Sequence, residues 1–228
     1  MTAAALPRRR GAWPVLLALL GSVAVLILLL FRRDGAAMAA IWWTSSTFNH
    51  VLLVPPLIAW LVSLRARDLA RVTPAAWWPG LLIVAAGAFG WLLGAAAGAD
   101  VVRQLGLVVM VQGAVVALLG PAVTRALLFP IGFALFLVPM GEALVPPLQT
   151  LTARMCILLL GWAGVPASID GVFITTPAGW FEVAEACSGV KFLVAMIAYG
   201  ALVANLCFAS PWRRAGFMAA AVAAPGIA

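Results

Sequence analysis

The sequence predicts an all-α protein that crosses a membrane several times. Three observations lead to this prediction. Hydrophobic residues make up 65% of the 228 residues and charged residues only 9%, whereas soluble domains contain about 45–50% and about 25%. The mean hydropathy is +1.14. The apolar residues also form long blocks, which must span lipid as helices because lipid offers the backbone no hydrogen-bond partners.

We expect about six full transmembrane helices, a shorter seventh segment, one interfacial helix and a small outer β-hairpin, all within one transmembrane domain covering residues 1–228. The expected full spans are 13–31, 48–64, 78–97, 101–119, 126–139 and 188–209. The residues between the first two spans, which include Trp42 and Trp43, are predicted to be an interfacial loop. Glycines in span 78–97 would allow close helix packing.

Arginines set the expected orientation, because cytoplasmic loops are enriched in Lys and Arg. The arginines at 8–10 put the start of the chain inside, and the charged loop 65–71 is inside as well. Arg103 is interpreted as an interfacial residue on the outer side.

Arg125 and the arginine pair 213–214 are also assigned to the inner side. Only one crossing is then available between Arg125 and Cys187. The short apolar run 151–162 should therefore lie on the outer face, as is usual for runs of about 10–14 residues. The hairpin, about 168–184, and Cys187 would then face the periplasm of a bacterial cell.

The last apolar segment, 215–228, has 14 residues, and a spanning helix needs about 20. We therefore expect the chain to end within a helix.

Charge and composition argue against several other functions. The formal net charge of +7 comes from arginines scattered between apolar blocks, which is typical of topology signals and not of a nucleic-acid interface. The chain has three cysteines without zinc-type spacing and a single histidine, His50. We expect neither a metal site nor a cofactor.

Cys187 is the candidate nucleophile. It lies in VAEACSGVKFL, residues 183–193, and is predicted to begin a long apolar helix after a polar, strand-like stretch. A helix N-terminus and a nearby cation both favour a thiolate. Lys191, four residues further on, would provide that cation from the same helix face. The alternative interpretation is a small buried hydrophobic residue.

The residues around Cys187 are candidates for its immediate surroundings. Gly189 would let an extended peptide approach closely, Glu185 would oppose the thiolate, and Ser188 adjoins the cysteine. His50 is the only histidine that could serve as a base for Cys187; the alternative interpretation, which we prefer, is an interfacial residue at a helix end.

The run EVAEACSGVKFL resembles the cysteine motif of the exosortase/archaeosortase family, in its exosortase A-like branch. Three further stretches resemble that branch: FNHVLLVPPLIAWL at 48–61, FPIGFALFLVPMGEALVPPLQTLT at 129–152 and DGVFITTPAGWFEV at 170–183. The resemblance runs from about Phe48 to Ala228.

The resemblance implies a multi-pass enzyme of the bacterial inner membrane, a cysteine protease-like transpeptidase with Cys187 as its catalytic residue. Its partners would be the lipid bilayer and exported proteins with a C-terminal sorting tail of the PEP-CTERM type. Such a tail has a Pro-Glu-Pro motif, a hydrophobic helix and a basic end. The resemblance also implies a link to exopolysaccharide and envelope biogenesis.

The family's catalytic pattern also contains an Arg and a His after the cysteine. Here only Arg213 and Arg214 follow Cys187, and no histidine follows it. His50 matches an early His-Gly region of the family, with Val51 in place of the glycine, and not the catalytic histidine. The resemblance therefore predicts a C-terminally incomplete chain that is inactive as it stands.

A non-enzymatic membrane transport or scaffold subunit is the alternative function. It would explain the proline-interrupted spans and the arginines within membrane segments. It would not explain a hairpin that leads into one cysteine beside the chain's only lysine. Substrate flux that is unaffected by Cys187→Ala would favour this alternative.

Overall fold

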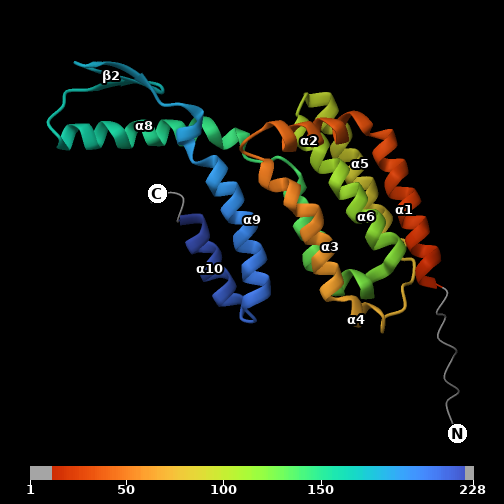
Figure 1. Cartoon of the computed structure of the whole chain (residues 1–228). Coiled ribbons are helices and arrows are strands. Elements are labelled where there is room, and N and C mark those ends of the chain that lie inside the picture. Colours follow the sequence, from red (N-terminus) through yellow and green to blue (C-terminus); the bar gives the residue numbers. More distant parts are fainter. Residues whose placement is uncertain (1–11, 224–228) are drawn as a thin grey trace, which may run out of the picture. The chain divides into compact units, whose positions relative to one another are not determined.

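The computed structural model describes residues 12–223, which divide into two compact units. The first contains the described residues up to Ser45 together with Asn49–Pro139, and the second contains Ser46–Phe48 together with the described residues from Met140. The described part of the chain is mostly helical (Figure 1), as the sequence predicted. The predicted chain end lies outside the described residues.

The first unit consists of helices and short 3-10 helices. In chain order these are α1 (Ala12–Leu30), α2 (Arg32–Thr44), η1 (Asn49–Leu53), α3 (Val54–Leu64), α4 (Ala66–Leu69), α5 (Gly80–Ala97), α6 (Asp100–Ala126), α7 (Leu128–Phe133) and η2 (Ala134–Leu137).

The second unit combines helices with a small sheet. Its elements are η3 (Glu142–Leu144), α8 (Val145–Trp162), β1 (Ser168–Asp170), β2 (Phe173–Thr176), β3 (Gly179–Glu182), η4 (Glu185–Ser188), α9 (Val190–Cys207) and α10 (Pro211–Ala223).

Within residues 12–223, four helices are long and apolar enough to cross a membrane, namely α1, α5, α6 and α9. A fifth crossing results if α2 is combined with η1 and α3, although the chain bends by 110° between them. The described apolar segment 128–137 is shorter. The predicted number of about six full spans therefore stays a prediction, whereas the multi-pass helical character is supported.

The prediction of a loop between the first two spans was wrong, because α2 occupies most of that segment. One face of this helix is buried, and that face is not recognisable from hydrophobic residues alone. Its buried residues are Asp34 and Met38, and the Trp42 indole N–H donates a hydrogen bond of 2.9 Å to the Leu137 carbonyl. The buried face of α2 thus contains a charged residue, Asp34.

Helices α5 and α6 pack closely because glycines recur on both of them. A Cβ atom on Gly87 would lie 2.8 Å from the Met110 backbone nitrogen, and one on Gly113 would lie 2.6 Å from that of Val84. Any side chain would therefore force the helices apart. A Cβ atom on Gly90 would have no neighbouring atom within 4 Å, so this glycine faces away from the contact.

Helix α6 contains a break at Gly120, where φ is 78°. The following residue, Pro121, has no N–H, so the carbonyl of Ala117 lacks its helical donor. The backbone N–H of Trp77 donates to that carbonyl at 2.7 Å. The irregular segment before α5 therefore satisfies the break in α6.

The sequence predicts that successive loops of the first unit lie on alternate sides of the membrane. Two contacts are consistent with this prediction. The Trp13 indole N–H donates to the Val72 carbonyl at 3.1 Å, which joins the start of α1 to the loop before α5. Asp34 pairs with Arg103, which joins the start of α2 to the start of α6. The members of each pair are expected on the same side of the membrane.

The second unit differs from the prediction at several boundaries. Helix α8 begins six residues before the predicted interfacial run, because Pro146 and Pro147 occupy its first turn, where proline is well tolerated. The predicted hairpin exists as β2 and β3, and β1 adds a third antiparallel strand. Helix α10 begins at Pro211 and not at Ala215.

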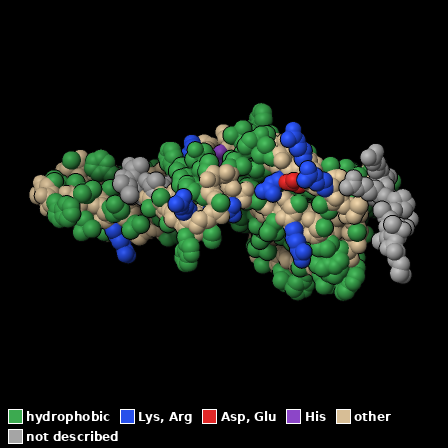
Figure 2. All heavy atoms as spheres, turned by 90° about the horizontal axis from the view of Figure 1, so that it is seen from below, with side chains coloured by type: hydrophobic (Ala, Val, Ile, Leu, Met, Phe, Trp, Pro, Cys, Tyr) green, Lys and Arg blue, Asp and Glu red, His purple; other side chains and the backbone are tan. Residues whose placement is uncertain are grey.

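Hydrophobic side chains are spread over the whole face shown in Figure 2, and the basic side chains on it occur singly or in small groups. Only 6% of the apolar window of α1 is buried within the protein. Exposed leucine and valine side chains on this scale suit contact with lipid, because soluble proteins rarely expose large continuous apolar areas.

Candidate active site

The candidate site is built on one face of α8. Ala153 is fully buried there and packs with Ile174 of β2 and with Val183, which follows β3. Gln149, one turn earlier, is also buried. The small side chain of Ala153 lets the sheet lie close to the helix, so α8 is the support on which the sheet rests.

The sheet directly precedes the turn that contains Cys187. Its strands follow in the order β1-β2-β3. Gly171 lies in the turn between β1 and β2, and Gly179 is the first residue of β3; both have positive φ. After β3, the Val183 N–H donates to the Val172 carbonyl at 2.9 Å. This bond extends the pairing by one step and fixes where the chain leaves the sheet.

Cys187 lies in η4, a single turn between the sheet and α9. Its backbone N–H donates to the Ala184 carbonyl at 2.9 Å, and its side chain is a free, exposed thiol. Gly189 then adopts a left-handed conformation with φ of 68°, which glycine adopts without steric cost. The cysteine is therefore accessible on a tightly folded turn.

The predicted helix start at Ser188 was early, because α9 begins at Val190. Cys187 and Lys191 therefore do not share a helix, and their spacing of four residues does not put them on one helix face. Lys191 is exposed in the first turn of α9. Its role as a support for the thiolate remains a prediction.

The other predicted neighbours have distinct positions. Glu185 is exposed at the start of η4, whereas Ser188 is buried. The Val190 N–H approaches the Ser188 hydroxyl oxygen at 3.4 Å, so this serine contributes to the start of α9. Gly189 provides the left-handed junction. His50 belongs to η1 in the first unit, and a pairing with Cys187 stays a hypothesis from the sequence.

Cys156 and Cys207 are free thiols as well. Cys156 is half-buried and packs against the cluster around Ala153. Cys207 is exposed at the end of α9. Neither is held in a turn like that of Cys187. Among residues 12–223, no three His, Cys, Asp or Glu side chains gather in a way that could hold a metal ion.

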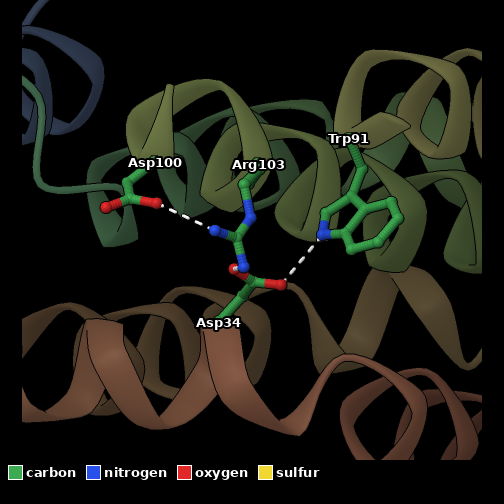
Figure 3. A network of polar contacts seen from close by, with 4 residues as sticks. All are labelled: Asp34, Trp91, Asp100 and Arg103. Atoms are coloured by element: carbon green, nitrogen blue, oxygen red, sulfur yellow. Dashed lines mark hydrogen bonds and ion pairs between the residues drawn. The ribbon is translucent and has the colours of Figure 1, made fainter. Parts of the chain in front are cut away.

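The first unit contains a polar network that the sequence did not reveal. Arg103 pairs with Asp34 and, at 2.9 Å, with Asp100. The other carboxylate oxygen of Asp34 accepts a hydrogen bond of 2.8 Å from the Trp91 indole N–H (Figure 3). Helices α2, α5 and α6 are thereby joined by one buried carboxylate. The partners are far apart in the chain, so only the fold brings them together.

The first unit also contains an apolar groove of about 1090 Å³. Its walls come from α1, α2, α3, α4, α6 and the segment 127–137, and nearly all of its lining side chains are hydrophobic. Arg32 and Gln112 are the polar exceptions.

The family model described as transmembrane exosortase matches residues 42–228 of this chain. The matched region contains Cys187, the sheet before it and α8. Searches among curated proteins and among solved structures found no match.

Proposed function

Because this chain belongs to the transmembrane exosortase family, we propose that it is a cysteine transpeptidase that cleaves C-terminal sorting tails of exported proteins. The observation that most supports this proposal is the setting of Cys187, an exposed thiol on a turn between a sheet and an apolar helix. The proposed substrates carry a PEP-CTERM type tail, and the proposed setting is the bacterial inner membrane with Cys187 facing the periplasm.

In the proposed reaction, the thiolate of Cys187 attacks the carbonyl carbon of the scissile peptide bond. The C–N bond breaks, the amine leaves with a proton, and the new N-terminal fragment is held as a thioester. An acceptor nucleophile then attacks the thioester carbon and releases the thiol. The exposure of Cys187 allows a substrate backbone to reach the sulfur.

The other catalytic groups of the family are an Arg and a His after the cysteine. The 228 residues contain Arg213 and Arg214 after Cys187 and no histidine there. In the proposed mechanism an Arg would stabilise the oxyanion and a His would protonate the leaving amine. We therefore propose that these 228 residues alone supply the nucleophile and leave a tailed substrate uncut.

The test is the replacement of single cysteines in the natural gene, followed by measurement of the ratio of cleaved to uncleaved substrate in cells. Cys187→Ser should reduce processing by orders of magnitude, because a hydroxyl is a far weaker acid than a thiol with a pKa of about 8.5. Cys156→Ser and Cys207→Ser are matched controls and should process normally. Normal processing by Cys187→Ser would show that the cysteine is structural.

A further inference from the structure

We propose that Thr152 and Gln149 of α8 are positioning residues that hold the turn of Cys187 in place for the reaction proposed above. The proposal rests on that function. It assigns to α8 a part in the chemistry, in addition to its role as the support of the sheet.

The two side chains bind the two ends of the cysteine turn. The Gln149 amide donates to the carbonyl of Val183 at 3.0 Å, where the chain leaves the sheet. The Thr152 hydroxyl donates to the carbonyl of Cys187 itself at 3.1 Å. The two residues are three apart, so they lie on one face of α8. One helix face therefore fixes both the entry and the far end of the turn.

Thr152 acts on the peptide unit of the nucleophile. The other bonds of the turn lie elsewhere: the Gln149 amide binds the Val183 carbonyl, the Cys187 N–H binds the Ala184 carbonyl, and the Ser188 hydroxyl lies near the Val190 N–H. A bond to the Cys187 carbonyl restricts rotation of the peptide plane next to the Cα atom, and therefore restricts the direction in which the Cα–Cβ bond carries the thiol away from the backbone. Misplacement of a reacting atom by about 1 Å can slow a reaction by about 100-fold.

The bond itself contributes little to folding. A hydrogen bond between neutral groups is typically worth about 0.5–1.5 kcal/mol, and the Thr152–Cys187 bond is solvent-exposed. Thr152→Val preserves the shape of the side chain and removes only the donor. A large loss of activity without a loss of stability would therefore point to positioning and not to structural support.

Thr150 provides a matched control on the same helix. Its hydroxyl donates to the Pro146 carbonyl of α8 itself, at 2.9 Å, so Thr150→Val removes a threonine donor without touching the cysteine turn. Thr152→Ser retains the donor and should restore function. Each variant is made in the natural protein and scored by the ratio of cleaved to uncleaved substrate and by the amount of protein in the membrane.

A second measurement separates orientation from thiol reactivity. In a background lacking Cys156 and Cys207, Cys187 is labelled in membranes with iodoacetamide or with a Pro-Glu-Pro peptidyl chloromethyl ketone. Iodoacetamide reports exposure and thiolate content, whereas the peptidyl reagent must align with the sulfur. Thr152→Val should slow peptidyl labelling by roughly 10-fold to 100-fold and leave iodoacetamide labelling unchanged.

The expected result is slow processing and slow peptidyl labelling for Thr152→Val, recovery in Thr152→Ser, and no change in Thr150→Val. Parent-like processing by Thr152→Val would overturn the positioning role while the proposed function stands. The positioning role would also be overturned if the amount of Thr152→Val protein fell as much as its processing, or if both reagents labelled it equally slowly. Either pattern indicates a structural role. Parent-like processing by Cys187→Ser would overturn both proposals.

Discussion

Replacing Asp34 by asparagine should destabilise the first unit more than any change at its exposed charges. The Asp34 side chain is 6% exposed and serves both Arg103 and Trp91. Removing one partner of a buried ion pair typically costs about 3–5 kcal/mol. The Arg103 side chain is 27% exposed and keeps Asp100 as a partner, and asparagine keeps one acceptor oxygen. We therefore expect a smaller cost, about 1.5–3 kcal/mol.

Asp100→Asn is the matched control, because it removes the same charge from the same Arg103. The Asp100 side chain is 74% exposed, and an exposed ion pair is worth about 0–1 kcal/mol. Its loss should therefore change stability little. The comparison isolates burial of the carboxylate as the cause of the difference.

The assay is thermal unfolding of the purified protein in detergent. For a chain of this size each kcal/mol shifts Tm by about 2–4 °C, so Asp34→Asn should lower Tm by about 3–12 °C. A double-mutant cycle with Arg103→Gln should show that most of this effect disappears once the arginine is gone. Equal shifts for Asp34→Asn and Asp100→Asn, or full additivity in the cycle, would refute the reasoning.

Three further predictions test other parts of the fold. Gly113→Ala should destabilise the α5–α6 contact by about 1–3 kcal/mol, whereas Gly90→Ala should be neutral or stabilising by up to about 1 kcal/mol. Equal Tm values for the two variants in a thermal shift assay would contradict the packing described. Gln149→Leu should lower Tm, because a buried carbonyl loses its donor at a cost of about 1–3 kcal/mol; an unchanged Tm would show that the bond is dispensable. An impermeant maleimide should label Cys187 in intact spheroplasts once Cys156 is replaced, and labelling only after lysis would overturn the orientation.

The sequence predicted α1, α5 and α9 well because each is a largely hydrophobic block, whereas α6 continues to Ala126, seven residues beyond its expected end. The boundaries of α5 and α9 fall within two residues of the expected ones. It also predicted the strands that precede Cys187, from β-branched and aromatic residues around a Pro-Ala-Gly turn. These signals are local, so they can be recognised without the fold.

Features that depend on distant residues were missed. Helix α2 was interpreted as an interfacial loop, and the partner of its buried Asp34, Arg103, lies 69 positions further along the chain. The turn of Cys187 was interpreted as a helix start, although Gly189 in a left-handed conformation separates the two. The role of α8 in holding that turn arises from hydrogen bonds over more than 30 positions, which no local pattern could indicate.

The glycines of α5 and α6 have a consequence for how this chain can change in length. Apart from Gly90, which faces away from the contact, those of α5 recur at 80, 87 and 94, and those of α6 at 106, 113 and 120. Seven residues make nearly two turns, so each series keeps to one side of its helix. Inserting a single residue rotates everything beyond it by about 100° and replaces glycines by larger side chains at the contact. Viable length variants of the α5–α6 pair should therefore add or remove whole seven-residue steps in both helices together.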